Sequence, residues 1–87
     1  MNTEFPSGEL DRIIAEIYLR SAETLTAEQK LDEDLGGDSL TVVELVMAIE
    51  RKMDVKLPDR GIGKIKTVGE LRELVRERWE TRKIIAS

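Results

Sequence analysis

Residues 35–53 read LGGDSLTVVELVMAIERKM, and this stretch decides how the chain folds. Two glycines and an acid lead into Ser39, and no glycine or proline interrupts the sequence from there to Met53. The pattern therefore predicts a helix over 39–53 with Ser39 as its first residue. Pro58 prevents a long continuation, because a proline disfavours helical backbone at the residue before it.

The predicted helix carries apolar side chains on two faces. At about 100° per residue, one arc faces the core and holds Val42, Leu45, Val46, Ile49 and Met53. A second arc, nearly opposite, holds Leu40, Val43 and Met47, with Glu44 and Glu50 at its edges. Burial all round would explain both arcs, but the charged residues of the same helix argue against it. An exposed apolar patch rimmed by acids is typical of a partner-binding surface, and we favour that interpretation.

Before this helix, the sequence predicts another helix and a long loop. Apolar residues with helical spacing favour a helix over about 8–20, with Pro6 and Ser7 as start signals. Asp11, together with Glu9, is expected in its first turn. The loop follows over 21–38, and Thr26 could open a short helical turn in it. Three leucines should pin this loop to the core: Leu25, Leu31 and Leu35.

After the central helix, the sequence predicts one short and one long helix. Ile62 and Ile65 favour a short helical turn, and Thr67 with Glu70 has the spacing of a capping box that opens the last helix. The apolar stripe of that helix consists of Val68, Leu71, Leu74, Val75 and Trp79. We expect residues 81–87 to form a frayed tail. The prediction is an all-α, four-helix bundle in one domain, 1–87, with three main helices and one short helix between the second and the last.

Composition excludes several kinds of chemistry. The 87 residues include no Cys and no His, so disulfides, thiolate zinc sites and side-chain thiol or histidine catalysis are absent. The beginning of the sequence lacks the features of a signal peptide, and no apolar run is long enough for a membrane span, so we expect a cytoplasmic protein. Residues 1–50 hold twelve acids and three bases, whereas 51–87 hold six acids and eleven bases. The acidic half repels nucleic acid and attracts basic partners.

Two chemical roles for the LGGDSL stretch fail on elementary grounds. The letters GDSL also name a family of lipases and esterases, but a serine hydrolase needs a base to take the proton of Ser39, and no histidine exists. A calcium loop starting at Asp32 would require a bidentate Glu at its twelfth position, where Val43 stands. A specific metal site is therefore not expected, although Glu33, Asp34 and Asp38 could gather a divalent cation weakly.

The third role is covalent modification, and here the sequence resembles the acyl carrier protein family. The resemblance is closest over 31–80. It rests on LGGDSL (35–40), VELVMAIE (43–50), LPD (57–59) and TV (67–68), at this spacing and in a chain of this length. It implies that Ser39 carries 4′-phosphopantetheine, added from coenzyme A by a separate phosphopantetheinyl transferase, with Asp38 in a supporting position. A phosphodiester there would lie at a helix N-terminus, which favours negative charge.

The resemblance also implies function and partners. The chain would be a monomeric carrier, not an enzyme, that holds acyl groups as thioesters and delivers them to acyl-loading and acyl-processing enzymes with basic patches. The pathway would be fatty acid, lipid or polyketide-type biosynthesis. The partner face would consist of Leu40, Val43, Glu44, Met47 and Glu50. Two alternatives stay open: an aminoacyl or peptidyl carrier, and a helical adaptor that is never modified.

Departures from the family pattern concern charge. Carriers of bulk fatty acid synthesis typically have an acid two residues after the serine and an acidic end of this helix. Here these places hold Thr41 and the pair Arg51-Lys52, and 59–64 reads DRGIGK. Since partner choice among carriers depends largely on charge complementarity, we interpret the chain as a specialised discrete carrier.

Overall fold

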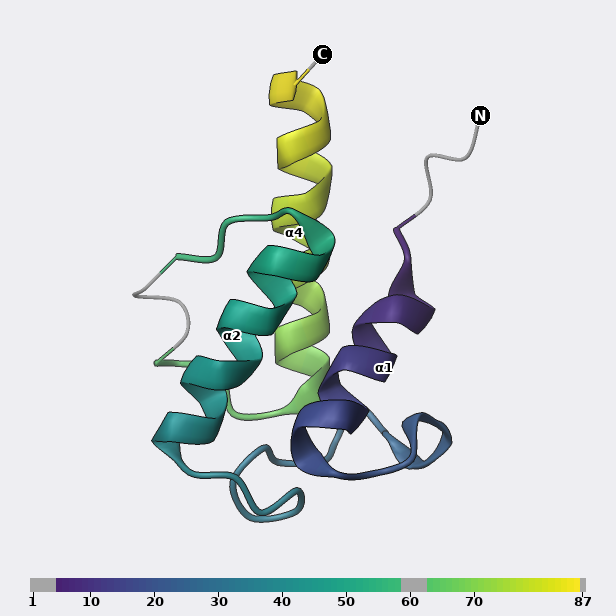
Figure 1. Cartoon of the computed structure of the whole chain (residues 1–87), viewed down its shortest axis with the longest axis vertical. Helices are drawn as coiled ribbons and strands as arrows, with labels where there is room; N and C mark the ends of the chain where they lie inside the picture. The colour runs from purple at the N-terminus through teal and green to yellow at the C-terminus, as the bar shows by residue number, and fades with distance from the viewer. Residues whose placement is uncertain (1–4, 59–62, 87) are drawn as a thin grey trace.

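The computed structural model describes residues 5–58 and 63–86, and in these residues it contains three α-helices and one short 3₁₀ helix. The helices are α1 (Ser7–Tyr18), η1 (Ala22–Thr24), α2 (Ser39–Met53) and α4 (Val68–Ala86). In Figure 1, α2 and α4 run in the same direction and α1 runs opposite to them. The N-termini of α2 and α4 therefore lie at the end of the bundle where α1 finishes. The helical content of the described residues confirms the all-α prediction.

The helix boundaries agree with the sequence most closely at α2. Its bounds are those predicted. The first helix ends at Tyr18, earlier than predicted, because Leu19 adopts a left-handed backbone with φ of 56°. The amide of Arg20 then donates to the carbonyl of Ala15 at 2.8 Å and closes the helix end.

The beginning of α4 also follows the sequence. The amide of Thr67 donates to Glu70 Oε1 at 3.1 Å, and the amide of Glu70 donates to Thr67 Oγ1 at 3.2 Å, which confirms the capping box. The frayed tail predicted for 81–87 is corrected as far as the backbone is described, because α4 stays helical to Ala86. No helix within 5–58 or 63–86 has the length and apolar content needed to cross a membrane.

The predicted short helix after α2 falls partly on 59–62, which lie outside the described residues. Of the remainder, Gly63 and Lys64 form a turn. In the described parts of the chain, the short helical segment is η1, which lies before α2 and not after it. Thus the expected position of the short helix is not reproduced by the residues that the structure describes.

The core is built from all three α-helices. The side chains with almost no solvent exposure are Leu10, Ile14, Leu45, Ile49, Val68, Leu71 and Val75. On α2, Leu45, Ile49 and Met53 of the predicted core arc are buried, and Val42 and Val46 are half-buried. Ala48 is also buried, which we did not predict. The second arc is exposed: Leu40 by 67%, Val43 by 50% and Met47 by 59%. The prediction of one core face and one exposed apolar face is confirmed.

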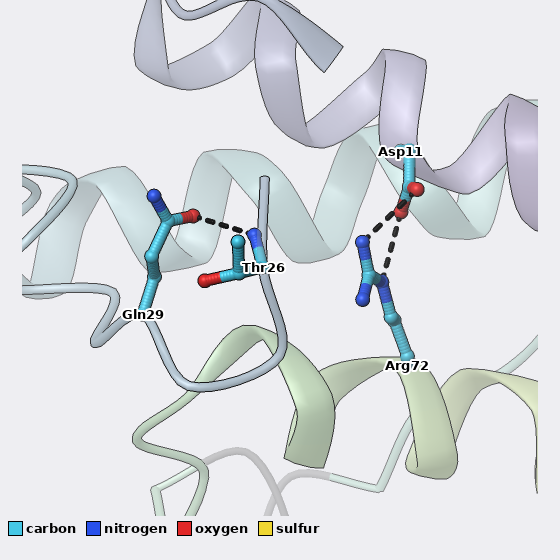
Figure 2. A network of polar contacts seen from close by, with 4 residues as sticks. All are labelled: Asp11, Thr26, Gln29 and Arg72. Carbon is cyan, nitrogen blue, oxygen red and sulfur yellow. Dashed lines mark hydrogen bonds and ion pairs between the residues drawn. The ribbon is translucent and has the colours of Figure 1, made fainter. Parts of the chain in front are cut away.

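A half-buried ion pair ties α4 to α1. Figure 2 shows the guanidinium of Arg72 facing the carboxylate of Asp11, with both contacts at 3.0 Å. Glu9 lies in the first turn of α1 as predicted, whereas Asp11 lies just beyond it, because the helix begins at Ser7. A two-pronged pair with restricted solvent access is the kind of ion pair that contributes to stability.

The long connection between α1 and α2 is held against the first turn of α4. The amide of Leu31 donates to the carbonyl of Lys66 at 2.9 Å, and the amide of Val68 donates to the carbonyl of Gln29 at 2.9 Å. Within the described residues, these bonds form an isolated antiparallel bridge between Lys30 and Thr67. Leu25, Leu31 and Leu35 are buried beneath the connection, which confirms that the loop is pinned to the core.

The expected helical turn at Thr26 does not form, although its capping contact does. The amide of Thr26 donates to Gln29 Oε1 at 3.0 Å, as Figure 2 shows. The backbone makes only a turn, in which the amide of Gln29 donates to the carbonyl of Thr26 at 3.2 Å. Helix cannot continue past this point, because the carbonyl of Gln29 accepts the amide of Val68, and the amides of Lys30 and Leu31 donate to Asp34 Oδ2 and to the carbonyl of Lys66.

The two glycines of LGGDSL have separate structural reasons. Gly36 has φ of +82°, a conformation that side chains rarely adopt. A Cβ on Gly37 would collide with the ring of Tyr18, which is 7% exposed. The loop before α2 therefore lies directly on the end of α1, and the glycines allow that close approach.

The two faces of α2 predict a difference between matched leucine substitutions. Leu45→Ala should lower the free energy of unfolding by about 2–5 kcal/mol, because Leu45 is fully buried. Leu40→Ala is the same change on the exposed face of the same helix, and should stay within about 0.5 kcal/mol of the parent. Urea titrations followed by circular dichroism measure both. Equal losses would mean that the exposed arc contributes to the core.

The contact between Gly37 and Tyr18 predicts opposite effects for two Gly→Ala changes. Gly37→Ala should destabilise the fold by about 1–3 kcal/mol, because the added methyl group needs space that the buried ring occupies. Gly8→Ala is the control: its Cβ would meet nothing within 4 Å, and it lies in α1, so stability should rise by about 0.5–1 kcal/mol. Thermal melts of the two variants check this, and a neutral Gly37→Ala would remove the assigned role of Gly37.

Candidate functional site

Ser39 is the first residue of α2 and is exposed. In the part of the chain that the structure describes, its hydroxyl makes no hydrogen bond. It lies at the positive end of a 15-residue helix, where backbone N–H groups and the helix dipole favour an anion. A hydroxyl in this position is available to an approaching enzyme and suited to carry a phosphate ester.

Asp38 is the N-cap of α2. Its Oδ1 accepts hydrogen bonds from the amide of Thr41 at 2.9 Å and from the hydroxyl of Thr41 at 3.0 Å. These bonds, the backbone bond first, lower the pKa of Asp38, so the group is ionised at neutral pH. Because the folded pKa is depressed, this cap stabilises the fold above the unfolded pKa and is lost as pH falls through the folded one. Asp38 therefore supports Ser39 by ordering the turn that presents it.

Thr41 completes the same capping box. The amide of Asp38 lies 3.4 Å from Thr41 Oγ1, so each residue receives a hydrogen bond from the backbone of the other. The sequence singles out Thr41 as a missing acid, with consequences for partners. In the structure the hydroxyl of Thr41 is bonded to Asp38 and helps to cap the first turn of α2. Its helical position also lies about 100° beyond that of Leu40, away from the exposed apolar arc.

An open groove of about 540 Å³ lies beside Ser39. One wall is formed by the pinned connection and the other by the segment that leads into α4; the lining includes Leu31, Asp32, Gly37, Asp38, Val42 and Ile65. Two cations, Lys30 and Lys66, also line it. An exposed hydroxyl, a helix N-terminus and an adjoining groove with cations fit a phosphodiester-linked arm.

Four of the five predicted partner-face residues form one exposed surface. Leu40, Val43 and Met47 are the exposed large apolar side chains of α2, and Glu44 is exposed beside them. Glu50 differs, because it is half-buried and its Oε2 accepts the amide of Leu57 at 2.9 Å. One oxygen of this predicted rim acid therefore stabilises the segment after α2, a role that sequence reasoning missed because it depends on how that segment folds back.

Two of the acids before Ser39 are bonded to the backbone. The carboxylate of Asp34 accepts the amide of Lys30 at 2.7 Å, and that of Asp32 accepts the amide of Glu33 at 2.6 Å. The side chain of Glu33 pairs with Lys30 at 3.6 Å. In the described residues, no group of three or more acidic side chains could hold a metal ion. Turn formation thus accounts for Asp32 and Asp34.

Tyr18 is a site-supporting residue that the sequence does not reveal. Its ring lies under Gly37, and its hydroxyl is buried without a hydrogen-bond partner in the described residues. Burial, followed by the charges of Asp32 and Asp38, raises the pKa of Tyr18. No local pattern points to this contact, since the residues are far apart in the sequence.

Comparison with known proteins gives consistent results. Residues 9–75 match the family described as the phosphopantetheine attachment site. The acyl carrier protein of Clostridium perfringens is 38% identical over 72 residues, which cover 83% of this chain and 95% of that protein. The acyl carrier protein of Wolinella succinogenes is 43% identical over 63 residues, covering 72% and 83%.

Solved structures show the same fold. The holo acyl carrier protein of Geobacter metallireducens superposes with a TM-score of 0.76 at 25% identity, covering 92% of this chain and 91% of that chain. The acyl carrier protein of Enterococcus faecalis gives 0.67 at 26% identity, covering 80% and 89%. With the matched family, the relatives and the helical arrangement in agreement, this chain belongs to the acyl carrier protein family, whose phosphopantetheine-attachment domain carries covalent 4′-phosphopantetheine.

Proposed function

We propose that Ser39 is the attachment residue, and that the chain delivers acyl intermediates to enzymes of fatty acid, lipid or polyketide-type biosynthesis. The observation that carries this proposal is the exposed, unbonded hydroxyl at the first position of α2, inside the LGGDSL motif. The arm, once attached, supplies the thiol that this cysteine-free chain lacks.

Attachment requires a separate enzyme. Ser39 Oγ forms a bond to the phosphorus of the pantetheine phosphate in coenzyme A, the diphosphate bond breaks, and adenosine 3′,5′-bisphosphate leaves. The hydroxyl proton must pass to a base of the transferase, since this chain has no histidine and Asp38 is held by Thr41. The chain is accordingly a substrate and carrier with no catalysis of its own, and we propose that it works as a cytoplasmic monomer.

Partner docking is proposed for the exposed face of α2. Leu40, Val43 and Met47 form its apolar centre, and Glu44, with the free oxygen of Glu50, forms an acidic rim. Apolar centres limit dissociation, whereas rim charges act mainly on the association rate and its salt dependence. Because the centre begins one residue after Ser39, an enzyme that docks there has its active-site entrance next to the arm.

Ser39→Ala should abolish arm loading and leave the fold intact, because it removes only the acceptor oxygen. The protein is incubated with coenzyme A and a phosphopantetheinyl transferase, and the intact mass is measured. Ser7→Ala is the matched control, since Ser7 is the exposed first residue of α1, and it should load like the parent. An arm on the Ser39→Ala variant would move the attachment site elsewhere, and an unloaded parent would favour an unmodified adaptor.

Glu44→Lys should slow arm loading and reduce its dependence on salt, because a rim charge that attracts basic partners is reversed. An exposed change of this kind should alter folding stability by no more than about 0.5 kcal/mol. Loading rates at several salt concentrations measure the effect. Glu23→Lys, the same charge change at an exposed position on η1, should load normally, and an equal slowing in both variants would contradict the assigned face.

A further inference from the structure

The docking face carries an acid, Glu44, toward its Ser39 end and gains an exposed cation, Arg51, at its far end. Leu40, Glu44, Met47 and Arg51 follow one another at intervals of four, three and four residues, so they lie on one stripe of the helix. Arg51 is exposed. The cation therefore belongs to the same surface as the apolar centre that we propose for docking, and the inference below rests on that proposal.

Lys52 shows what a purely structural cation at this helix end does. It lies about 100° further round the helix than Arg51, and its Nζ is 3.1 Å from Glu16 Oε1 on α1. Both residues are basic groups in the last turn, where the helix dipole favours positive charge. The ion pair and the dipole together account for Lys52, whereas the dipole by itself does not require an arginine on the docking stripe.

A groove of about 590 Å³ continues the docking face beyond Met47. Its other lining residues are Glu50, Arg51, Asp54, Val55 and Lys56. Glu50 is turned to the amide of Leu57, and Arg51 and Lys56 form no ion pair among the residues that the structure describes. The groove therefore presents two exposed cations, Arg51 and Lys56, next to the end of the apolar patch, together with the carboxylates of Glu50 and Asp54.

The Ser39 end carries more acids than bases. Asp32, Glu33 and Asp38 line the groove beside the serine together with Lys30 and Lys66, and Lys30 and Glu33 are paired with each other at 3.6 Å. Ser39 and Arg51 are separated by about 18 Å along the helix axis, from twelve residues at 1.5 Å each. A single partner domain can span this distance and contact both ends.

We infer that the enzymes served by this carrier have a two-sign docking patch. Basic groups lie near the entrance of their active site, opposite Glu44 and the acids before Ser39. An aspartate or glutamate lies about 18 Å from the position opposite Ser39 and binds in the groove between Arg51 and Lys56. An enzyme whose patch is basic throughout is repelled at the Arg51 end, and charge of the wrong sign is an effective means of rejecting a partner.

The test uses the acylated holo protein and a ketoacyl synthase of bulk fatty acid synthesis selected for an entirely basic docking patch. The parent should be a poor substrate. Arg51→Gln should raise kcat/KM about two- to threefold, and Arg51→Glu should raise it about three- to tenfold. In both variants the gain should come from a lower KM, and kcat/KM should depend more steeply on salt concentration. Lys52→Gln is the matched control, with the same loss of charge on the α1 side, and it should leave kcat/KM unchanged.

A reciprocal change in the synthase makes the test specific. In the synthase, the one basic residue of the patch that faces the far end of α2 is changed to Glu. This change should raise kcat/KM for the parent carrier and lower it for the Arg51→Glu carrier, so the two changes are coupled. The two-sign patch would be overturned if Arg51→Gln and Lys52→Gln had equal effects on kcat/KM. It would also be overturned if the effects of the carrier and synthase substitutions were simply additive. Intact mass is measured first. If the parent protein takes no arm, the proposed carrier function is contradicted. If it is loaded but the Arg51 substitutions do not change kcat/KM, only the two-sign docking patch is contradicted.

Discussion

The structure depends on the backbone hydrogen bonds that hold the α1–α2 connection against the first turn of α4. The amides of Leu31 and Val68 are bonded across this junction, and the amide of Gly69 donates to the carbonyl of Ala27 at 3.0 Å. They fix the path of a long loop that has no α-helix or sheet of its own. Because the loop is fixed there, Gly37 rests on Tyr18 and α2 begins where Ser39 is exposed beside an open groove.

At the start of α2, the residues that cap the helix are distinct from the serine that we propose for attachment. Asp38 and Thr41 bond each other and order the first turn. Ser39 is left without a structural task, so its hydroxyl can be modified without removing a hydrogen bond that the fold needs. A serine acting as the N-cap would have combined both tasks in one oxygen, and modification would then have weakened the helix.

The same division applies along α2. One face supplies Leu45 and Ile49 to the core, while the opposite face keeps Leu40 and Met47 exposed. The charged residues are divided as well: Lys52 bonds α1, and Arg51 stays on the exposed stripe. Of the charge departures noted in the sequence, Thr41 is explained by helix capping and Lys52 by its ion pair, whereas Arg51 is explained by neither. Partner selection is therefore to be sought at the far end of the helix.

The sequence by itself determined the bounds and two-faced character of α2, the capping box of α4 and the candidate serine, because caps, breakers and stripes depend on residues within one or two turns. Tertiary structure decided what no local pattern contains. It assigned Gly37 to Tyr18, stopped the helix expected at Thr26, and turned Glu50 toward Leu57. These outcomes depend on contacts between segments that the chain must first bring together, and the side chains there have more than one possible partner until the fold selects one.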